Sequence, residues 1–382
     1  MKRLITSESV SKGHPDKVAD QISDAILDAY LEVDPKSKVA VETMVKDNAV
    51  ILGGEVKSNG QINVDKTIRD VVKSIGYTDA FHGFHYKTLT IINLIGKQSN
   101  EINRAVELDT EVTAGDQGFM TGFATNETPN FMPLGMYISK KIVDHVSKQF
   151  GLGPDAKSQV TIEESESGKR IHTILVSTMH LATIQLSVLR ERVRKIITSN
   201  DMELSEDIFS LIDENTNIVV NPAGTWNTGG PVSDCGLTGR KIVVDQYGPY
   251  CPVGGGAFSG KDSSKCDRSG AYLARYIAKN IVASGIANKC KVEIAYMIGV
   301  AKPTSLNIDT FGDFRDDELL SHIIMDIFPM TPQETIDHFK LTRPIFSETA
   351  QGHFGNPDMS WEKTDLADMI EFKLAQAGLE KI

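Results

Sequence analysis

The order of helical and strand-like segments is the feature that most constrains how this chain can fold. Residues 15–33 place apolar side chains at helical spacing, and Pro15 suits the first turn of a helix. Two apolar runs then flank Lys46-Asp47-Asn48, which is typical of a β-hairpin. A short helix is predicted over 64–75 and a buried strand over 87–96, which completes a first round of helices and paired strands.

The same order returns twice along the chain. In the second round, helices are predicted over 136–150 and 184–199, and strands over 158–165 and 170–180. In the third round, a strand over 241–247 leads through a glycine-rich loop to a helix over roughly 262–283, a strand over 291–300, and helices near 315–327 and 331–340. Three rounds of roughly 100–130 residues each fit three domain-sized units. Strands joined by tight turns favour an α+β fold over a parallel sheet.

Composition narrows the class of protein. The chain has 382 residues, 40% of them hydrophobic, and a net charge of −11. This charge argues against a nucleic-acid-binding protein, which needs a basic surface. No stretch approaches the ~20 apolar residues of a membrane span, and the N-terminus lacks the apolar region of a signal peptide. The cysteines lack zinc-type spacing and are expected to be free thiols in a reducing cytoplasm; they are Cys235, Cys251, Cys266 and Cys290.

A glycine-rich loop carries one of two basic clusters. Gly255 and Gly260 are separated by four residues and followed by Lys261, which matches the start of a phosphate-binding P-loop. Asp262 then stands where a P-loop has serine or threonine, so the loop is either an altered P-loop or a different way of holding phosphates. Asp262 is predicted to cap the following helix rather than to bind a metal. The clustered cations of this acidic chain are expected to face a local anion; they are Arg240, Lys241, Lys261, Lys265 and Arg268.

Several polar residues lie where a ligand could bind. His14, Asp16 and Lys17 lie where a loop enters the first helix, whose N-terminus favours anions. In the alternative interpretation, Asp16 only favours the helix dipole and His14 faces solvent. Glu42 lies in an apolar strand, so it is paired, metal-bound or solvent-facing. Glu55 follows two glycines, where a ligand can approach the backbone closely.

Two polar segments have the composition of long loops. Residues 98–118 show little apolar periodicity, which is typical of a lid or a disordered loop. Asp116 lies near the end of this segment between glycines, and it either binds a ligand or makes a turn. Residues 222–234 form a loop rich in glycine and proline that carries Trp226.

Ten short motifs, in their order and spacing, resemble those of the S-adenosylmethionine synthetase (methionine adenosyltransferase) family. They are GHPDK, VAVETMVK, GGE, GKQS, AGDQG, ATNET, PDAKSQV, DCGLTGRK, GGGAFSGKDSSK and GHFG. The resemblance extends over about residues 3–370 and includes WEKTD at 361–365. Each motif alone is a weak to moderate signal, and the specificity comes from finding all ten in register.

The resemblance implies an α+β protein of three domains related by pseudo-threefold repetition. The implied ranges are 1–98 for an N-terminal domain, 99–118 for a flexible lid over the site, 119–228 for a central domain and 229–382 for a C-terminal domain. The family also implies homodimers with active sites at the subunit interface, paired into cytoplasmic homotetramers. Its substrates are ATP and L-methionine, and its cofactors are Mg²⁺ (two per site) and K⁺. Methionine sulfur attacks C5′ of ATP, and the released triphosphate is hydrolysed to pyrophosphate and phosphate.

The resemblance also implies roles for individual residues. His14 resembles the residue that assists departure of the triphosphate, and the phosphate cations would be Lys157, Arg240, Lys241, Lys261 and Lys265. Further contacts to ATP would come from Asp155, Trp226, Asp234 and Ala257. Contacts to methionine would come from Glu55, Gln98, Asp116, Asp234 and Lys265. Asp16 and Asp267 resemble magnesium ligands, and Glu42 resembles the potassium ligand.

Four positions depart from the usual family pattern. Thr225 replaces an arginine before the aromatic residue Trp226, Thr113 replaces a glycine, Val41 replaces a cysteine, and Lys12 replaces an acid. None is a predicted metal ligand or phosphate cation, so we expect activity with altered turnover or nucleotide affinity. Two alternatives stay open. One is a catalytically silent member that binds nucleotide as a regulatory subunit, and the other is a P-loop NTPase or kinase that forms ADP without methionine.

Overall fold

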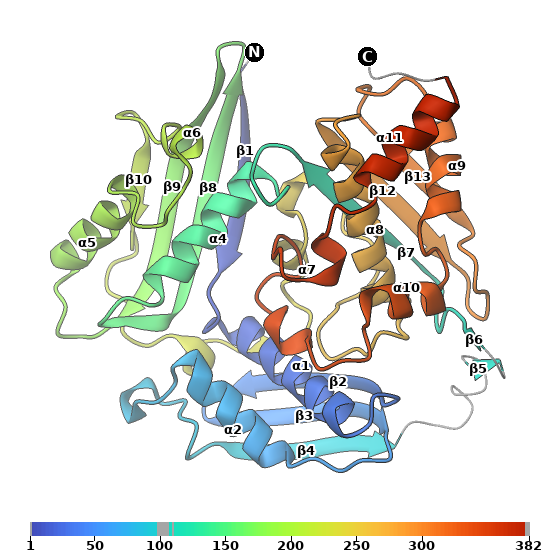
Figure 1. Cartoon of the computed structure of the whole chain (residues 1–382). Helices are drawn as coiled ribbons and strands as arrows, with labels where there is room; N and C mark the ends of the chain where they lie inside the picture. The colour runs from blue at the N-terminus through green and yellow to red at the C-terminus, as the bar shows by residue number, and fades with distance from the viewer. Residues whose placement is uncertain (1, 98–106, 109–110, 379–382) are drawn as a thin grey trace.

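In the part of the chain that the structure describes, helices pack against three larger β-sheets, as Figure 1 shows for the computed structural model. The structure describes residues 2–97, 107–108 and 111–378. Gln98 and half of the predicted lid, residues 99–106 and 109–110, therefore lie outside the described residues. The described end of that lid carries a small antiparallel pair, β5 (Glu107–Leu108) and β6 (Glu111–Val112). The domain boundaries drawn from the sequence stay a prediction.

The first sheet, at the bottom of Figure 1, has the strand order β11-β2-β3-β4. β2 (Lys38–Lys46) and β3 (Ala49–Lys57) form the predicted hairpin, and β4 (Thr90–Lys97) runs parallel to β3. β11 (Gly236–Leu237) comes from far along the chain and pairs with β2. The two predicted helices are confirmed as α1 (Pro15–Val33) and α2 (Val64–Ile75), and a 3-10 turn follows at Ala80–His82.

The second sheet has the order β1-β8-β9-β10 and its own apolar core. β1 (Arg3–Val10) pairs antiparallel with β8 (Leu152–Ser165), which pairs with β9 (Gly168–His180). β10 (Asn217–Val220) runs parallel to β9 at the edge. The helices of this part are α4 (Leu134–Val146), α5 (Leu186–Thr198) and the single turn α6 (Glu206–Phe209).

The third sheet has the order β13-β12-β7 and packs against the long helix α8. Its strands are β7 (Gly118–Thr125), β12 (Lys289–Tyr296) and β13 (Ser305–Asp309). Its helices are α8 (Cys266–Ala283), α9 (Asp317–Ile327), α10 (Pro332–Phe339) and α11 (Ala367–Gln376). Further 3-10 turns of the chain lie at Gly230–Val232, Gly248–Tyr250, Phe346–Glu348 and Ser360–Glu362. A continuous apolar core joins this part to the first sheet. Beside α8, buried Glu362 accepts hydrogen bonds from buried Arg275 and Lys279 at 2.9 and 2.8 Å.

The strand predicted over 241–247 is wrong, because this segment forms the helical turn α7 (Ile242–Asp245). Its β-branched residues favour a strand, but tertiary ion pairing decides the conformation. Asp245 is buried and forms an ion pair with Lys17 of α1, while Lys17 also lies 3.0 Å from Asp20. A helical turn places Lys241 and Asp245 one above the other, so that both reach α1.

Three further expectations need correction. The strand predicted as buried over 87–96 is β4, whose Ile92 and Leu94 are 43% and 66% exposed, because β4 is an edge strand packed on one face only. The helix expected from about residue 262 begins at Cys266. The tight turns predict antiparallel pairs, but the first two sheets each also contain one parallel pair, β3 with β4 and β9 with β10, whereas the third sheet is antiparallel. β1, β7, β10, β13 and α11 were not predicted. Within the described residues, no helix combines the length and apolarity needed to cross a membrane.

Candidate active site

A row of four buried aspartates on α1 positions the loops that carry most of the predicted site residues. Asp16, Asp20, Asp24 and Asp28 follow at four-residue spacing, so they share one face of the helix. Each accepts hydrogen bonds of 2.7 to 3.0 Å from backbone N–H groups of distant loops; the donors are Leu237, Gly239, Gly260, Phe346 and Ser347. Of these four, only Asp16 was predicted as a site residue, although the spacing of the other three is visible in the sequence.

Asp16 gathers a first group of cations at the N-terminus of α1. Lys241 Nζ lies 2.5 Å from Asp16 Oδ2, and Arg240 Nε lies 3.9 Å from Oδ1. The two adjacent cations therefore approach the same carboxylate, because they precede a helical turn and not a strand. Burial opposes the charged form of Asp16, but hydrogen bonds from Lys241 and Leu237 outweigh it and hold the pKa of this carboxyl below its ordinary value.

His14 is the N-cap residue of α1, and its side chain is 1% exposed. Its Nδ1 accepts a hydrogen bond from the backbone N–H of Asp16 at 3.2 Å, which places the proton of the neutral ring on Nε2. Burial, and then the charges of Lys241 and Lys157, lower the pKa of His14 to about 3. His14 is therefore a neutral hydrogen-bond donor near pH 7, and the interpretation of His14 as a solvent-facing residue is wrong.

Asp155, near the start of β8, is a second buried carboxyl beside this group. Its Oδ2 accepts a hydrogen bond from Gly230 N–H at 2.8 Å, and its Oδ1 has no partner among the described residues. Burial raises the pKa of Asp155 to about 7 against the effect of the Gly230 hydrogen bond, and the charge of Asp234 raises it further. Trp226 lies four residues before Gly230 in the same loop, so this loop connects the predicted adenine contact to Asp155.

The glycine-rich loop holds a second charged group. Lys261 Nζ lies 2.6 Å from Asp267 Oδ2, and Gly256 N–H donates to Oδ1 at 3.0 Å. A Cβ at Gly256 would lie 2.7 Å from Asp267 Oδ2 and 2.9 Å from Lys261 Nζ, so a side chain there would displace this ion pair. Gly260 has a φ of +79°, and a Cβ there would lie 1.9 Å from the carbonyl oxygen of Val41. The two glycines thus let the loop close around the ion pair and against β2.

Lys265 belongs to a separate pair in the same loop. It forms an ion pair with Asp262, which also accepts hydrogen bonds from Val39 N–H of β2 and Ser264 N–H at 2.8 and 2.9 Å. Lys265 itself is the N-cap residue of α8, and no side chain bonds that helix end. The prediction that Asp262 caps the helix is wrong, because its carboxylate ties the loop to β2 instead.

The two charged groups lie along one edge of β2. β11 pairs with β2 at Met44, and Lys261 forms a β-bridge with Ala40. Four residues of strand separate these points by about 13 Å. The two loops touch between them, because a Cβ on Gly239 would lie 2.4 Å from the Cβ of Ala257. The first group therefore lies near one end of a single loop-built surface and the second near the other.

Asp116 lies on the side of the second group. A Cβ at Gly118 would lie 3.9 Å from Asp267 Oδ1, which brings the described end of the lid next to this carboxylate. Burial raises the pKa of the neighbouring Cys266 thiol, and the charges of Asp267 and Asp116 raise it further. The predicted methionine contact Asp116 and the predicted magnesium ligand Asp267 are therefore neighbours.

Glu42 and Glu55 lie on the outer face of the first sheet, opposite the face that packs on α1. Both are exposed, whereas the alternating residues of β2, such as Val41, are buried. The structure thus places these two predicted ligands on a surface beside the charged groups and not within them. Their strand neighbours include exposed apolar residues, among them Met44 and Leu94.

The side chains around Asp16 and Asp267 decide whether these predicted ligands fit a metal ion. Within residues 2–97, 107–108 and 111–378, no three His, Cys, Asp or Glu side chains gather in a way that could hold a metal ion. Asp16 and Asp267 are instead single carboxylates, each facing a lysine. This arrangement fits Mg²⁺, which commonly takes one or two protein carboxylates and completes its shell with phosphate and water oxygens.

The geometry also excludes the P-loop interpretation. A P-loop connects a strand directly to a helix. Here the glycine-rich loop follows a 3-10 turn at Gly248–Tyr250, and the helix after it packs against the antiparallel pair β7 and β12. The glycine-rich loop is therefore not an altered P-loop.

Comparisons with known proteins agree with this arrangement. Models of the S-adenosylmethionine synthetase N-terminal, central and C-terminal domains match residues 2–100, 111–226 and 228–363. S-adenosylmethionine synthases of Wolinella succinogenes and Helicobacter hepaticus are 47% and 46% identical, over 96% of this chain and 97% of each relative. A solved structure of an unusual S-adenosylmethionine synthetase from Campylobacter jejuni has a TM-score of 0.88 and 39% identity, and covers 96% of this chain and 98% of that one. With such identities over nearly its whole length, the chain belongs to the S-adenosylmethionine synthetase family.

Proposed function

We propose that this chain is an active S-adenosylmethionine synthetase, which joins the adenosyl group of ATP to the sulfur of L-methionine. The sulfur attacks C5′, the C5′–O bond breaks, and the triphosphate leaves whole before it is hydrolysed to pyrophosphate and phosphate. One observation carries the proposal: the α1 aspartates hold two loops side by side, and each loop presents a lysine paired with a carboxylate. These pairs are Lys241 with Asp16 and Lys261 with Asp267.

Stabilisation of charge is the main work of the protein in this reaction. Triphosphate leaves readily only if cations already placed around it meet its growing negative charge. Lys157, Arg240 and Lys241 supply such cations at the N-terminus of α1, and Lys261 and Lys265 supply them from the glycine-rich loop. Carboxylates already hold Arg240 and Lys241 in one group and Lys261 and Lys265 in the other, so the phosphates replace carboxylates as their partners on binding.

His14 assists the departure of the leaving group. Its neutral ring donates a hydrogen bond from Nε2 to the oxygen that bridges C5′ and the triphosphate. The lowered pKa of His14, caused by burial and by Lys241 and Lys157, makes it a donor of hydrogen bonds and not a donor of whole protons.

Methionine and adenosine need orientation more than activation. The methionine sulfur carries no proton and needs no base, so the protein has to align it with C5′. Glu55, Asp116 and Asp234, together with Gln98 and Lys265, contact methionine. The adenosine side is bound by Trp226, Asp155, Asp234 and Ala257, and Trp226 stacks on the adenine ring.

Metal ions complete the proposed site. Asp16 and Asp267 would hold the two Mg²⁺ ions, and Glu42 would hold K⁺. Bound magnesium neutralises part of the phosphate charge and supplies Lewis acidity to the leaving triphosphate. The lysines facing Asp16 and Asp267 stay within reach to bind phosphate oxygens.

A homodimer that pairs the outer faces of the first sheet accounts for their exposed apolar residues. Met44, Ile51 and Ile92 are cross-strand neighbours on β2, β3 and β4, and Met44 and Ile92 are 36% and 43% exposed. Monomeric proteins rarely leave such contiguous apolar surface open to water. Pairing these faces would bring Glu42 and Glu55 of one protomer towards its partner, with the active sites at the interface. Two such dimers would form the homotetramer.

The test is an incubation of the purified protein with ATP, L-methionine, Mg²⁺ and K⁺. We expect S-adenosylmethionine together with equal amounts of pyrophosphate and phosphate. An oligomer that binds ATP without forming this product would favour a silent regulatory subunit. Formation of ADP without methionine would favour an NTPase.

A further inference from the structure

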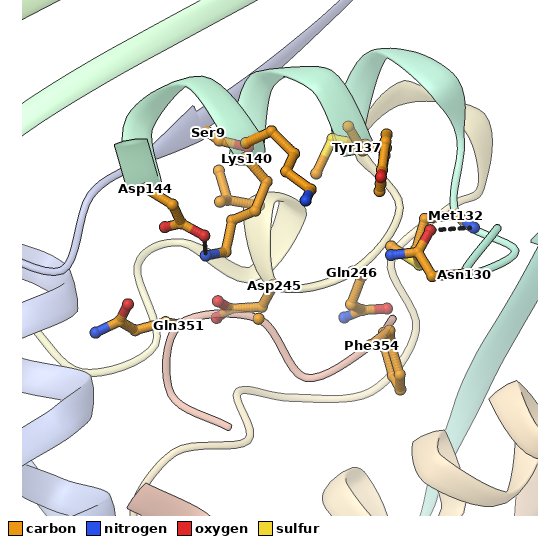
Figure 2. A pocket seen from close by; sticks show the side chains of 14 residues that line it. Ser9, Asn130, Met132, Tyr137, Lys140, Asp144, Asp245, Gln246, Gln351 and Phe354 are labelled. Carbon is orange, nitrogen blue, oxygen red and sulfur yellow. Dashed lines mark hydrogen bonds and ion pairs between the residues drawn. The ribbon is translucent and has the colours of Figure 1, made fainter. Parts of the chain in front are cut away.

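A separate cavity of about 130 Å³ lies between α4, α7 and the segment 351–354 (Figure 2). None of the residues that line it belongs to the predicted active site. Tyr137 and Met136 of α4 line one side, Asp245 and Gln246 come from α7 and the residue after it, and Phe354 lines a third side. Three segments that are distant in the sequence thus enclose one small space.

Gln246 is the residue of this cavity whose unpaired side-chain amide indicates a ligand. The residue is 2% exposed, and both its side-chain atoms, Oε1 and Nε2, are buried without a hydrogen-bond partner among the described residues. A buried amide that leaves both a donor and an acceptor unpaired is costly and uncommon. Figure 2 shows Gln246 in the lining beside Phe354.

The charged side chains of the lining, its other two amides and the hydroxyl of Ser9 already have partners. These contacts are Lys140 with Asp144, Asp245 with Lys17, Gln351 with Gln21, Ser9 with Ser139, Asn130 with Gly355, and Lys141 over the ring of Tyr137. Both carboxylates of the lining thus face a lysine, and the four charged side chains that line the cavity (Lys140, Lys141, Asp144 and Asp245) sum to zero. A ligand that fits needs no net charge and must satisfy the amide of Gln246.

The apolar part of the wall favours a flat ring. The ring of Phe354 is stacked on the ring of Tyr247 with the two planes 7° apart, so Tyr247 holds Phe354 in one orientation. Tyr137 and the flexible thioethers of Met132 and Met136 add polarisable surface. The volume is close to that of an engineered cavity of about 150 Å³ that accepts benzene.

We propose that this cavity binds an uncharged aromatic ring that carries a carboxamide. The ligand amide pairs with Gln246 through two hydrogen bonds, one donated by each partner, as Gln side chains pair with the donor–acceptor edge of a base. The ring lies among Phe354, Tyr137 and the methionines. Because α7 lies directly between Lys241 and Gln246, an occupant contacts the segment that holds this phosphate cation.

Nicotinamide serves as the probe, measured by calorimetry on the full chain without substrates. We expect saturable binding with a Kd on the order of 1 mM or tighter. Gln246→Leu should weaken binding by about tenfold or more, whereas Gln333→Leu on α10 should leave it unchanged. Nicotinate, which has the same ring but a charged acid in place of the amide, should bind about tenfold more weakly. Excess ATP should not displace nicotinamide.

Thermal unfolding of the ligand-free variants gives a second measurement. Gln246→Leu removes an unpaired buried amide and nearly keeps its volume, so its Tm should equal or exceed that of the wild type. A lowered Tm would show that water or protein already satisfies Gln246, and would overturn the proposal. Absence of saturable nicotinamide binding, full binding by Gln246→Leu, or displacement by ATP would also overturn it. These measurements need no catalytic activity, so their outcome does not depend on whether the proposed function is correct.

Discussion

Replacing Lys261 with alanine tests the triphosphate role at a single charge. The Lys261 side chain is 26% exposed, and its ammonium lies 2.6 Å from Asp267, so it is held at the surface of the loop. At about 4 Å from a phosphate oxygen, with an effective dielectric constant of about 20, one unit charge contributes ~4 kcal/mol. Loss of one comparable oxyanion donor costs about 2–4 kcal/mol of barrier stabilisation. We therefore expect kcat of Lys261→Ala to fall about 30-fold to 900-fold.

The assay is the initial rate of S-adenosylmethionine formation at saturating ATP, methionine and Mg²⁺, together with the Tm of each variant. Lys291→Ala is the matched control, because Lys291 is 24% exposed and lies 3.3 and 3.7 Å from Glu293 and Asp309 in the third sheet. It should keep wild-type kcat. If Lys261→Ala also stayed within about threefold of the wild type, the assignment of Lys261 to the triphosphate would be refuted.

Four further outcomes are expected. Glu362→Gln should lower the free energy of unfolding in urea by about 3–5 kcal/mol, because it leaves the buried cation of Arg275 without a counter-charge. A loss below about 1 kcal/mol would contradict this. Burial raises the pKa of Asp155 to about 7, so the folded chain keeps a proton that the unfolded chain releases above its ordinary pKa of 3.8. Wild-type stability relative to Asp155→Asn should therefore fall as pH rises from about 4 to about 7, and urea midpoints that differ equally at both pH values would count against it. Leu94→Asp should give monomers in sedimentation velocity and lose activity, and an intact active oligomer would disprove the sheet-face dimer. Gly260→Ala should lower both Tm and kcat, and unchanged values would show that the loop tolerates a side chain there.

The elements that could be predicted from sequence are those whose signals are local. α1 and α2 have strong helical periodicity and were placed at the correct residues. The β2–β3 hairpin turns at Lys46-Asp47-Asn48, and Asp47 adopts a positive φ of 51°, which aspartate tolerates better than most residues. The site motifs were also found, because the resemblance identifies them one by one.

The elements that could not be predicted depend on distant partners. α7 has the composition of a strand, and only the buried pairing of Asp245 with Lys17 of α1 explains its helical turn. The apolar run of β4 predicts burial, but nothing in the run itself indicates that its outer face is left exposed by the described residues. The α1 aspartates resemble an ordinary polar helix face, because the loop N–H groups that bind them lie 219 to 319 residues further along the chain.

The pairing of β1 with β8 imposes an order of events during synthesis. Arg3 pairs with Glu164 and Val10 with Lys157, so the partner of the first strand leaves the ribosome about 150 residues later. At 5–20 residues per second, β1 waits roughly 8–30 s with the N–H and C=O groups along both edges unpaired. Another nascent chain can pair with such an unpaired strand, which leads to aggregation. The yield of folded protein should therefore depend more on the translation speed between residues 10 and 157 than on the speed after that point.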